Sequence, residues 1–363
     1  MDDSRAPHDQ APRLGVLLVN LGSPEAPSPR AIRRYLREFL SDSRVIEIPR
    51  LLWLAILYLL VLPFRPGRIA KGYQAIWTDR GSPLTVYTAD LASALQIRMA
   101  QRIPGPVTVD WAMRYGSPSI HTKLSQLKAA GAERLLIVPL YPQYSGTTTA
   151  SVFDAVTATL RGWRWIPELR FVTAYHDHGA YIDALCESVR NHPSSNSPEA
   201  RHLVMSFHGI PQRYIEQGDP YFCHCHKTAR LLADALDLKP DEYSVSFQSQ
   251  FGKAQWVGPS TSDTLTQLAE AGTKELRVVC PGFAADCIET LEEIQIENRD
   301  IFRDAGGETL HYVPALNATQ GHVQAMESLV IQHASGWPEA LGDSAQRDRR
   351  NAPHRVRSLE DGA

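Results

Sequence analysis

Four ionisable residues in the second half of the chain have types and spacings that suit proton transfer and metal binding. His208 directly follows the apolar segment 202–207, which places its imidazole at the end of a predicted strand. A neutral imidazole can accept a proton near neutral pH or ligate a divalent metal. Glu289, Glu293 and Glu297 recur at every fourth position, so a helix would stack three carboxylates along one face. The ordinary alternatives are a structural loop histidine and a solvated acidic face.

Like charges at this spacing repel each other unless a cation or a proton is shared between them. Two further features favour a functional acidic row over a solvated one. The opposite side of the predicted helix carries Ile288, Leu291 and Ile296, which are apolar enough to hold it against the rest of the protein. The row also begins just after the predicted strand 276–280, and ligands of open α/β sheets bind at the carboxyl ends of strands.

The five cysteines predict neither a disulfide framework nor a zinc site. Segment 222–226 reads FCHCH, but a zinc site usually needs a second pair of ligands at similar spacing, and no such pair lies nearby. An iron–sulfur cluster would need four cysteine ligands, and Cys186, Cys280 and Cys287 are scattered. Scattered thiols in odd number are typical of a reduced, cytoplasmic protein.

The elements that must position these residues alternate between strands and helices. Short β-branched runs separated by helical patterns predict an α/β fold with parallel strands. A helix is predicted over residues 30–40, with Ser28 and Pro29 as its start. The predicted strands cover residues 14–20, 107–111, 135–139, 170–174, 202–207, 243–247, 276–280 and 310–313.

An internal duplication divides the chain into two similar Rossmann-like lobes with a cleft between them. The helix–Gly–strand pattern of residues 124–138 recurs 141 residues later, whereas VNLGSP at 19–24 and SFHGIP at 206–211 are 187 residues apart. The difference between the two offsets indicates about 46 extra residues in the first lobe. After the first strand and after the repeat strand, it is the second lobe that carries ionisable groups, with Leu21 of the first lobe standing where the second has His208.

This duplication sets the expected domain boundaries. We expect a disordered tail over residues 1–12, an N-terminal lobe over 13–170 and a C-terminal lobe with the metal site over 171–337. A second disordered tail is expected over 338–363 because it is polar and lacks periodicity. The extra residues of the first lobe are expected at about 45–84.

One segment of this insertion is strongly apolar. Residues 51–62 read LLWLAILYLLVL, an unbroken apolar run of twelve residues between Arg50 and Arg65. A membrane-spanning helix needs roughly 17–25 residues, so the run predicts a peripheral, interfacial contact rather than a span. A buried core helix is the alternative. The net charge of −3 and a pI near 6.5 make nucleic acid an unsuitable partner, and GxGxxG, P-loop, HExxH and GxSxG motifs are absent.

Taken in order, several motifs over nearly the whole chain closely resemble those of the ferrochelatase family. The combination of SFHGIP, GDPY, FQSxFG and IETLEE in this order is specific, although each is weak alone. The matching stretches are LLVNLGSPEAP (17–27), YLREFLSD (35–42), GSPL (81–84), MRYGSPSI (113–120), PLYPQYSGTTTAS (139–151), SFHGIP (206–211), GDPY (218–221), FQSQFGKAQWVGPST (247–261) and PGFAADCIETLEEI (281–294).

The resemblance implies a chelatase fold and a set of site residues. His208 and Glu289 would face each other across a porphyrin cleft as the catalytic and metal-handling pair. Arg114 and Trp256 would line the porphyrin pocket, and the apolar insertion would form its lip. The family's line of acidic residues, which would carry metal or protons, falls on Asp286, Glu293 and Glu297.

The implied activity is insertion of Fe²⁺, as substrate, into protoporphyrin IX to form protoheme, the last step of heme biosynthesis. Many relatives have a second His where this chain has Cys287, so a His/His/Glu triad does not carry over. The C-terminal tail has no cysteine, so no iron–sulfur cluster is expected. GSP and SGT loops are expected to bind propionates through backbone N–H groups.

Two alternatives to this activity stay open. One is a chelatase for coproporphyrin III or for another metal, such as cobalt; the other is a non-catalytic heme or metal carrier with a similar cleft. The expected location is cytoplasmic, with a peripheral contact at the inner membrane surface.

Overall fold

The computed structural model describes residues 13–250, 252 and 254–340. The tail predicted over 1–12 and most of that predicted over 338–363 lie outside the described residues. The exception is η5 (Pro338–Ala340), a short 3₁₀ turn in which Pro338 and Glu339 are buried. These residues lie past the predicted boundary and pack on the first lobe, where Glu339 contacts Gly105 and Arg134.

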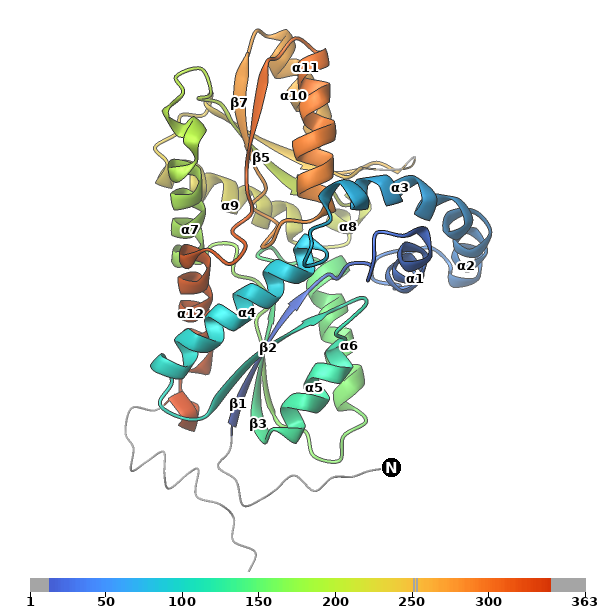
Figure 1. The fold of residues 1–363 in the computed structure, drawn as a ribbon, viewed down its shortest axis with the longest axis vertical. Coiled ribbons are helices and arrows are strands. Elements are labelled where there is room, and N and C mark those ends of the chain that lie inside the picture. The colour runs from blue at the N-terminus through green and yellow to red at the C-terminus, as the bar shows by residue number, and fades with distance from the viewer. Residues whose placement is uncertain (1–12, 251, 253, 341–363) are drawn as a thin grey trace, which may run out of the picture.

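Two four-stranded parallel sheets of identical topology form the centres of the two lobes, as Figure 1 shows. The strand order is β2-β1-β3-β4 in lobe one and β6-β5-β7-β8 in lobe two. This equivalence confirms the predicted duplication and the α/β class. The strands are β1 (Arg13–Asn20), β2 (Val107–Met113), β3 (Ala132–Pro139) and β4 (Glu168–Phe171), then β5 (Leu203–His208), β6 (Tyr243–Gln248), β7 (Glu275–Val279) and β8 (Thr309–Val313).

Helices cover the faces of both sheets, as buried parallel strands require. The repeat helices α5 (Ile120–Ala129) and α10 (Thr261–Glu270) begin alike: Ser119 Oγ accepts from the Thr122 amide, and Ser260 Oγ accepts from the Asp263 amide. The other helices of the lobes are α4 (Pro83–Arg102), η2 (Gly146–Ala150), α6 (Ser151–Leu160), α7 (Gly179–Asn191), η3 (Pro193–Asn196), α8 (Gln212–Glu216), α9 (Tyr221–Ala235), η4 (Glu289–Asn298), α11 (Arg299–Asp304) and α12 (Gln320–Ala334).

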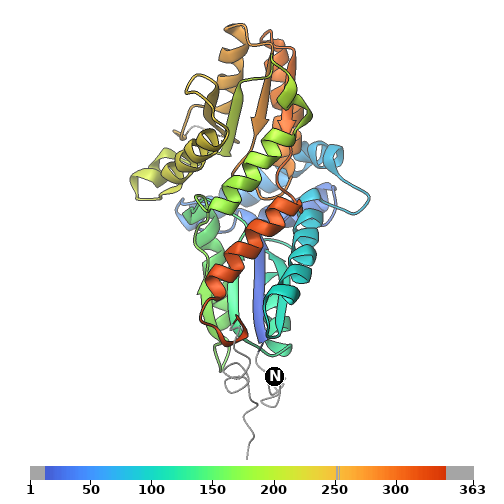
Figure 2. The same ribbon diagram turned by 90° about the vertical axis from the view of Figure 1, so that its left-hand side faces the viewer.

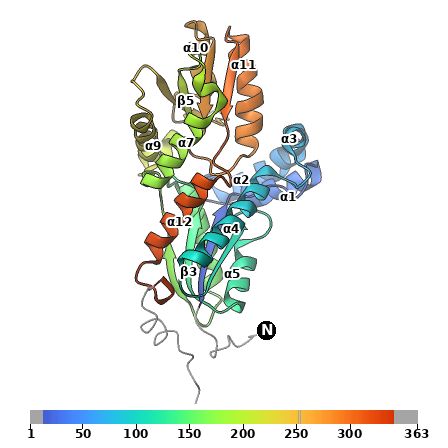
Figure 3. The same cartoon turned by 60° about the vertical axis from the view of Figure 1, so that its left-hand side comes forward.

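The C-terminal helix α12 crosses from lobe two back onto lobe one. It packs against α7 and α4, and Figures 2 and 3 show it continuing the line of α7 down the molecule. Glu327 of α12 forms ion pairs with Arg98 and Arg102 of α4. We expected all of residues 171–337 in the second lobe; α12 instead joins the two lobes, and the largest core cluster contains residues of both.

A mainly helical part of lobe one, made of the predicted insertion and the helix before it, projects to the right in Figure 1. It consists of α1 (Pro29–Phe39), α2 (Arg50–Ile56), the π-helical turn η1 (Leu57–Val61) and α3 (Leu62–Ile76). The predicted start of α1 is confirmed, with Pro29 in the first turn and Ser28 Oγ accepting from the Ala31 amide at 3.4 Å. Ile32, Leu57 and Tyr73 form part of the insertion's own small core.

From Arg50 to Ile76 the insertion is one helical segment of 27 residues, which by length and composition alone could cross a membrane. The helix is longer than the apolar run because it continues past Pro63 into a polar half that packs on η4. Six large side chains between residues 51 and 64 stay exposed, from 86% for Leu51 to 48% for Tyr58, which excludes the buried-helix alternative for them. We call these residues the lip: Leu51, Leu52, Tyr58, Leu59, Leu60 and Phe64.

Candidate active site

His208 is the last residue of β5, half-buried at the carboxyl edge of the second sheet. Its Nδ1 lies 2.6 Å from the carbonyl oxygen of Gly209. Because a carbonyl can only accept a hydrogen bond, Nδ1 must carry the proton, and the neutral ring then has its lone pair on Nε2. The fold thus holds His208 as a base or metal ligand at one defined nitrogen.

Glu293 of η4 lies next to His208 and is held by the strand beside it. His208 pairs in register with Gln248 at the end of β6. The following residue, Ser249, donates its amide to Glu293 Oε1 at 2.6 Å and its hydroxyl to Oε2. Burial raises the pKa of Glu293, the Ser249 donors and His208 oppose that rise, and Glu289 adds to it. The structure therefore brings together two of the predicted residues that lie 85 positions apart in the chain.

The acidic row lies on a π-helix rather than on the α-helix that its spacing suggested. In η4, Asn298 reaches back to donate to the Glu293 carbonyl at 2.7 Å, in a helix whose backbone bonds join residues five apart. A π-helix has more than four residues per turn, so positions four apart remain neighbours. Glu289 and Glu293 are half-buried and Glu297 is exposed, so the row runs from the interior to the surface.

Glu289 faces the inner side of the insertion. Burial raises the pKa of Tyr73 well above its usual value, and the Glu289 charge adds to the rise. The pKa of Tyr35 is raised for the same reasons. Burial lowers the pKa of Arg65, and the negative charge of Glu289 opposes that fall. Burial raises the pKa of the thiol of Cys287, in the position where many relatives have a second His, well above its usual value, and the Glu289 charge adds to the rise. The insertion thus covers Glu289 as well as carrying the lip.

Glu292 is a further acidic residue of this site that the four-residue spacing missed. A Cβ atom at Gly72 of α3 would lie only 3.1 Å from Glu292 Cγ, so Gly72 allows the insertion to approach η4 closely. Burial raises the pKa of Glu292, and Glu297, Glu293 and Glu289 add to the rise. The adjacent letters EE in the motif were the available signal.

Asp286 has different surroundings from the other predicted acids. It is 4% exposed, and its oxygens accept hydrogen bonds from Thr290, Tyr312, Ala315 and Asn317. These bonds fix the start of η4 and leave the carboxylate saturated with donors. The structure therefore places Asp286 beneath the row rather than in it.

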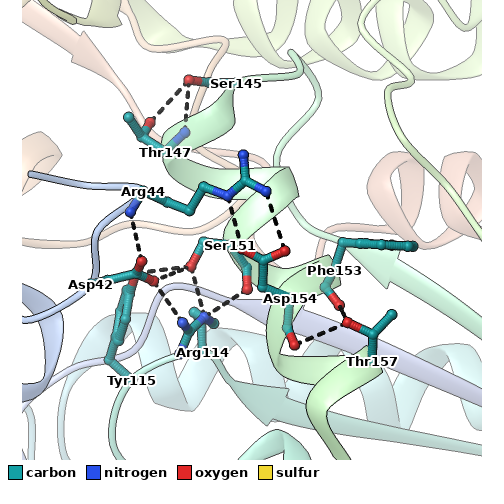
Figure 4. A network of polar contacts seen from close by, with 10 residues as sticks. All are labelled: Asp42, Arg44, Arg114, Tyr115, Ser145, Thr147, Ser151, Phe153, Asp154 and Thr157. Carbon is teal, nitrogen blue, oxygen red and sulfur yellow. Dashed lines mark hydrogen bonds and ion pairs between the residues drawn. The ribbon is translucent and has the colours of Figure 1, made fainter. Parts of the chain in front are cut away.

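Arg114 is tied into a polar network at the end of β2, which Figure 4 shows. Its guanidinium donates to Asp42 Oδ2 at 2.6 Å and to Ser151 Oγ at 2.7 Å. The same Asp42 oxygen accepts from Tyr115 and Ser151, and these donors hold the pKa of Asp42 below its usual value although burial opposes them. The charge of Arg114 is therefore largely compensated. Asp42 is a residue of this network that sequence reasoning missed.

Trp256 lies beside the loop that follows His208. It pairs with Pro211 in an isolated bridge, and its ring atom Cε3 would lie 3.3 Å from a Cβ at Gly209. Two of the amides expected to bind propionates are already occupied by carboxylates of the protein. Gly116 N donates to Glu38 at 3.0 Å, and Gly146 N donates to Asp219 at 2.7 Å. That expectation is wrong for these two amides.

Among the described residues, no three His, Cys, Asp or Glu side chains converge as a metal-binding group. Cys223 is exposed and Cys225 is buried, so the FCHCH segment directs its two thiols to different environments.

Comparison with known proteins identifies the family. The ferrochelatase family model matches residues 13–334. The chain belongs to the ferrochelatase family. Ferrochelatases of Thioalkalivibrio sulfidiphilus and Herminiimonas arsenicoxydans are 51% and 52% identical to it, covering 98% and 94% of this chain and 97% and 92% of their own lengths. The chain is accordingly an enzyme of the lyase class that acts in heme biosynthesis, with a porphyrin and ferrous iron as substrates.

Solved structures of other chelatases share the fold of this ferrochelatase. SirB from Bacillus subtilis with Fe³⁺ aligns with a TM-score of 0.54 at 12% identity, covering 89% of this chain and 96% of its own. The sirohydrochlorin chelatase SirB from Bacillus subtilis subspecies spizizenii, in complex with cobalt, aligns with a TM-score of 0.52, also at 12% identity, over 90% and 97%. At this identity the likeness concerns the two-lobed chelatase fold alone.

Proposed function

We propose that this enzyme inserts Fe²⁺ into protoporphyrin IX to form protoheme, with His208 and Glu289 as its catalytic and metal-handling residues. The observation that carries the assignment of the site is the Nδ1 hydrogen bond of His208 to Gly209, which leaves Nε2 as the basic nitrogen of a ring close enough to Glu293 to oppose the rise of its pKa. A proton acceptor and a row of cation ligands are the two components that metalation of a porphyrin requires.

His208 removes the pyrrole protons. Each metalation replaces two N–H protons of the macrocycle with one Fe²⁺, so the reaction releases two protons for each iron inserted. Nε2 accepts a proton as a general base, and the nearby Glu293 carboxylate stabilises the imidazolium that forms. Glu297, exposed at the far end of η4, connects this pair to solvent.

Glu289 guides the metal. Carboxylate oxygens suit a partly hydrated divalent ion, and Glu289, Glu292, Glu293 and Glu297 influence one another's charge along η4. Like charges held together lower the cost of binding a cation and raise the cost of leaving the row empty. We assign Asp286 to positioning η4, since its oxygens are saturated with donors.

Trp256 and Arg114 form walls for the porphyrin. Trp256 offers an aromatic face beside the His208 loop, where a flat macrocycle can stack. Arg114 orders the opposite wall through Asp42 and Ser151 instead of presenting an uncompensated charge.

One anaerobic assay tests the function and its alternatives. The enzyme would be supplied with Fe²⁺ and, in parallel, with protoporphyrin IX or coproporphyrin III, and product would be followed by absorbance. The exposed apolar lip favours the less polar protoporphyrin IX, so kcat/KM is expected to be higher for it. Faster insertion into coproporphyrin III would reverse the substrate assignment, and stoichiometric binding without turnover would identify a carrier.

The lip supports a peripheral membrane contact of a cytoplasmic enzyme at the inner membrane surface. Leu51, Leu59 and Leu60 expose 86%, 71% and 60% of their surface at one end of the molecule. Arg68 and Lys71 follow in the same helix and are exposed, as expected for an interfacial element whose charged half stays near the headgroups. A membrane surface would deliver the poorly soluble porphyrin to the adjacent cleft.

We further expect the enzyme to work without an iron–sulfur cluster. The four buried cysteines are divided among three core clusters, and Cys186 and Cys225 share one of them. Cys280 and Cys287 belong to different core clusters. A cluster would need four convergent thiolates.

A further inference from the structure

A loop of lobe one makes several hydrogen bonds to lobe two. Residues 143–146 follow β3, and Gln143 Nε2 donates to Thr228 Oγ1 at 3.0 Å and to the Pro281 carbonyl at 3.4 Å. The Tyr144 amide donates to His224 Nδ1 at 3.2 Å. Thr228 and His224 both lie on α9 of lobe two. The two lobes are therefore joined by hydrogen bonds of this loop as well as by the apolar core that they share.

Asp219 is the charged centre of this contact. Its Oδ2 accepts from Ser145 Oγ at 2.9 Å and from Gly146 N at 2.7 Å, while its Oδ1 accepts from Tyr221 N at 3.0 Å. Gly146 begins the continuous helix η2–α6 of lobe one, and Tyr221 begins α9 of lobe two. One carboxylate thus satisfies the first amides of two helices and complements the positive ends of both.

The same contact reaches the catalytic histidine. The side chain of Tyr221, which is 7% exposed, reaches the end of β5: a Cβ atom at Gly282 would lie 3.8 Å from its hydroxyl and 3.5 Å from the ring of Phe207, the residue before His208. A path of three residues therefore joins the helix of lobe one to the end of β5: Asp219, Tyr221 and His208. A change in the separation of the lobes would be transmitted to the residue that must meet the pyrrole nitrogens.

We propose that Asp219 is a positioning residue that fixes the separation of the two cleft walls and, through Tyr221, the placement of His208. This role rests on the proposed function, since it assumes that the porphyrin occupies the cleft between the lobes. Asp219 touches neither porphyrin nor iron in this account. Its effect on rate comes from holding Ser145 and Gly146 of lobe one at a set distance from His208.

The experiment compares Asp219→Ala with helix-cap variants confined to one lobe. Ser119→Ala and Ser260→Ala each remove one cap within a single lobe and serve as matched controls. Loss of charge-assisted hydrogen bonds is expected to lower kcat/KM for porphyrin about tenfold in Asp219→Ala. The controls should stay within about twofold of wild type at the same temperature, because a lost cap changes stability and not lobe separation.

Spin labels report the separation directly. Gln126 and Gln267 are exposed at equivalent positions of α5 and α10, and Cys223→Ser removes the exposed native thiol. The Gln126–Gln267 distance distribution should broaden in Asp219→Ala and remain narrow in both controls. Tyr221→Phe should lower kcat without changing the distance, because it removes only the hydroxyl near the end of β5.

Unchanged kcat/KM or an unchanged distance distribution in Asp219→Ala would overturn the proposal. Should that variant not fold, Ser145→Ala removes one inter-lobe bond while Asp219 remains, and the same two results decide. Wild-type turnover in the same assay separates this outcome from failure of the proposed function.

Discussion

For single residues, the role of each side chain in this site depends on which of its polar atoms already have hydrogen-bond partners within the protein. Gly209 holds the His208 proton on Nδ1, and Ser249 holds both oxygens of Glu293. Asp286 is saturated by its neighbours, so its charge cannot be offered to a passing ion without breaking hydrogen bonds. The acids of η4 therefore differ in role although they share one motif.

Replacing the glutamates one at a time should produce a graded loss of iron insertion. We expect Glu289→Gln to lower kcat by about 100-fold or more, Glu293→Gln by about tenfold and Glu297→Gln least, since Glu297 is exposed. The measurement is anaerobic steady-state kinetics with Fe²⁺ as the varied substrate. Glu308→Gln, at an exposed position of lobe two, is the control. Equal and small losses at all three positions would indicate a solvated acidic face.

At the scale of elements, the helical insertion has two different faces. Its inner face places Tyr73 and Arg65 beside Glu289, and its outer face exposes the lip. Trp53 belongs to the inner face, because its Nε1 donates to the Leu40 carbonyl at 2.6 Å and its ring packs on the insertion core. A test of membrane contact must therefore leave Trp53 in place.

Replacing Leu51, Leu59 and Leu60 together with Ser should weaken binding to liposomes by about two orders of magnitude or more. The three side chains are exposed, so folding should survive. The KM for protoporphyrin IX presented in liposomes should rise while kcat stays close to wild type, since His208 and Glu289 lie in lobe two. Flotation and kinetics measure the two effects, and Ile97→Ser, 63% exposed on α4, is the control. A triple variant that floats like wild type would remove the lip from the account.

The strands of this fold were predictable from sequence, whereas the packing between distant elements was not. Buried parallel strands are short β-branched runs, and the repeat of residues 124–138 at 265–279 predicted the matching topology. The approach of Gly72 to Glu292 depends on a contact across more than two hundred residues. The π-helical form of η4 has no signature in its spacing, because residues four apart are neighbours in α- and π-helices alike.

In the molecule as a whole, the two lobes are joined by polar contacts between distant parts of the chain. Glu327 of α12 forms ion pairs with Arg98 and Arg102 of lobe one, and Asp219 of lobe two accepts a hydrogen bond from Gly146 of lobe one. Two buried histidines lie in these connections. His176 precedes α7 and stacks on His224 at 3.7 Å between ring centroids, and His322 lies fully buried at the start of α12.

These histidines predict that the folded enzyme loses stability in mild acid. Burial lowers the pKa of His322 and of His176 from 6.5 to about 4, and His224 adds to the effect on His176. Between these values the unfolded chain binds more protons than the native one, so stability falls as the pH drops from 6.5 towards 4. Glu293 and Glu339 have raised pKa values and act in the opposite direction above about 4.5.

The His322→Asn variant isolates the histidine contribution. The amide can still donate to the Asn317 carbonyl that His322 Nδ1 now contacts, and it has no charge to gain. Urea unfolding at pH 7 and pH 5 should show the stability advantage of wild type over the variant shrinking as the pH falls. An advantage that is the same at both pH values would contradict the assignment.

In the proposed reaction, His208 removes the pyrrole protons while the rest of the cleft binds the macrocycle. The most direct measurement is anaerobic insertion of Fe²⁺ into protoporphyrin IX by His208→Ala, with porphyrin affinity determined in parallel by fluorescence. Loss of a general base is expected to lower kcat by about 100-fold or more, with little change in porphyrin affinity because the imidazole contributes little contact area. Turnover within about tenfold of wild type would contradict the account.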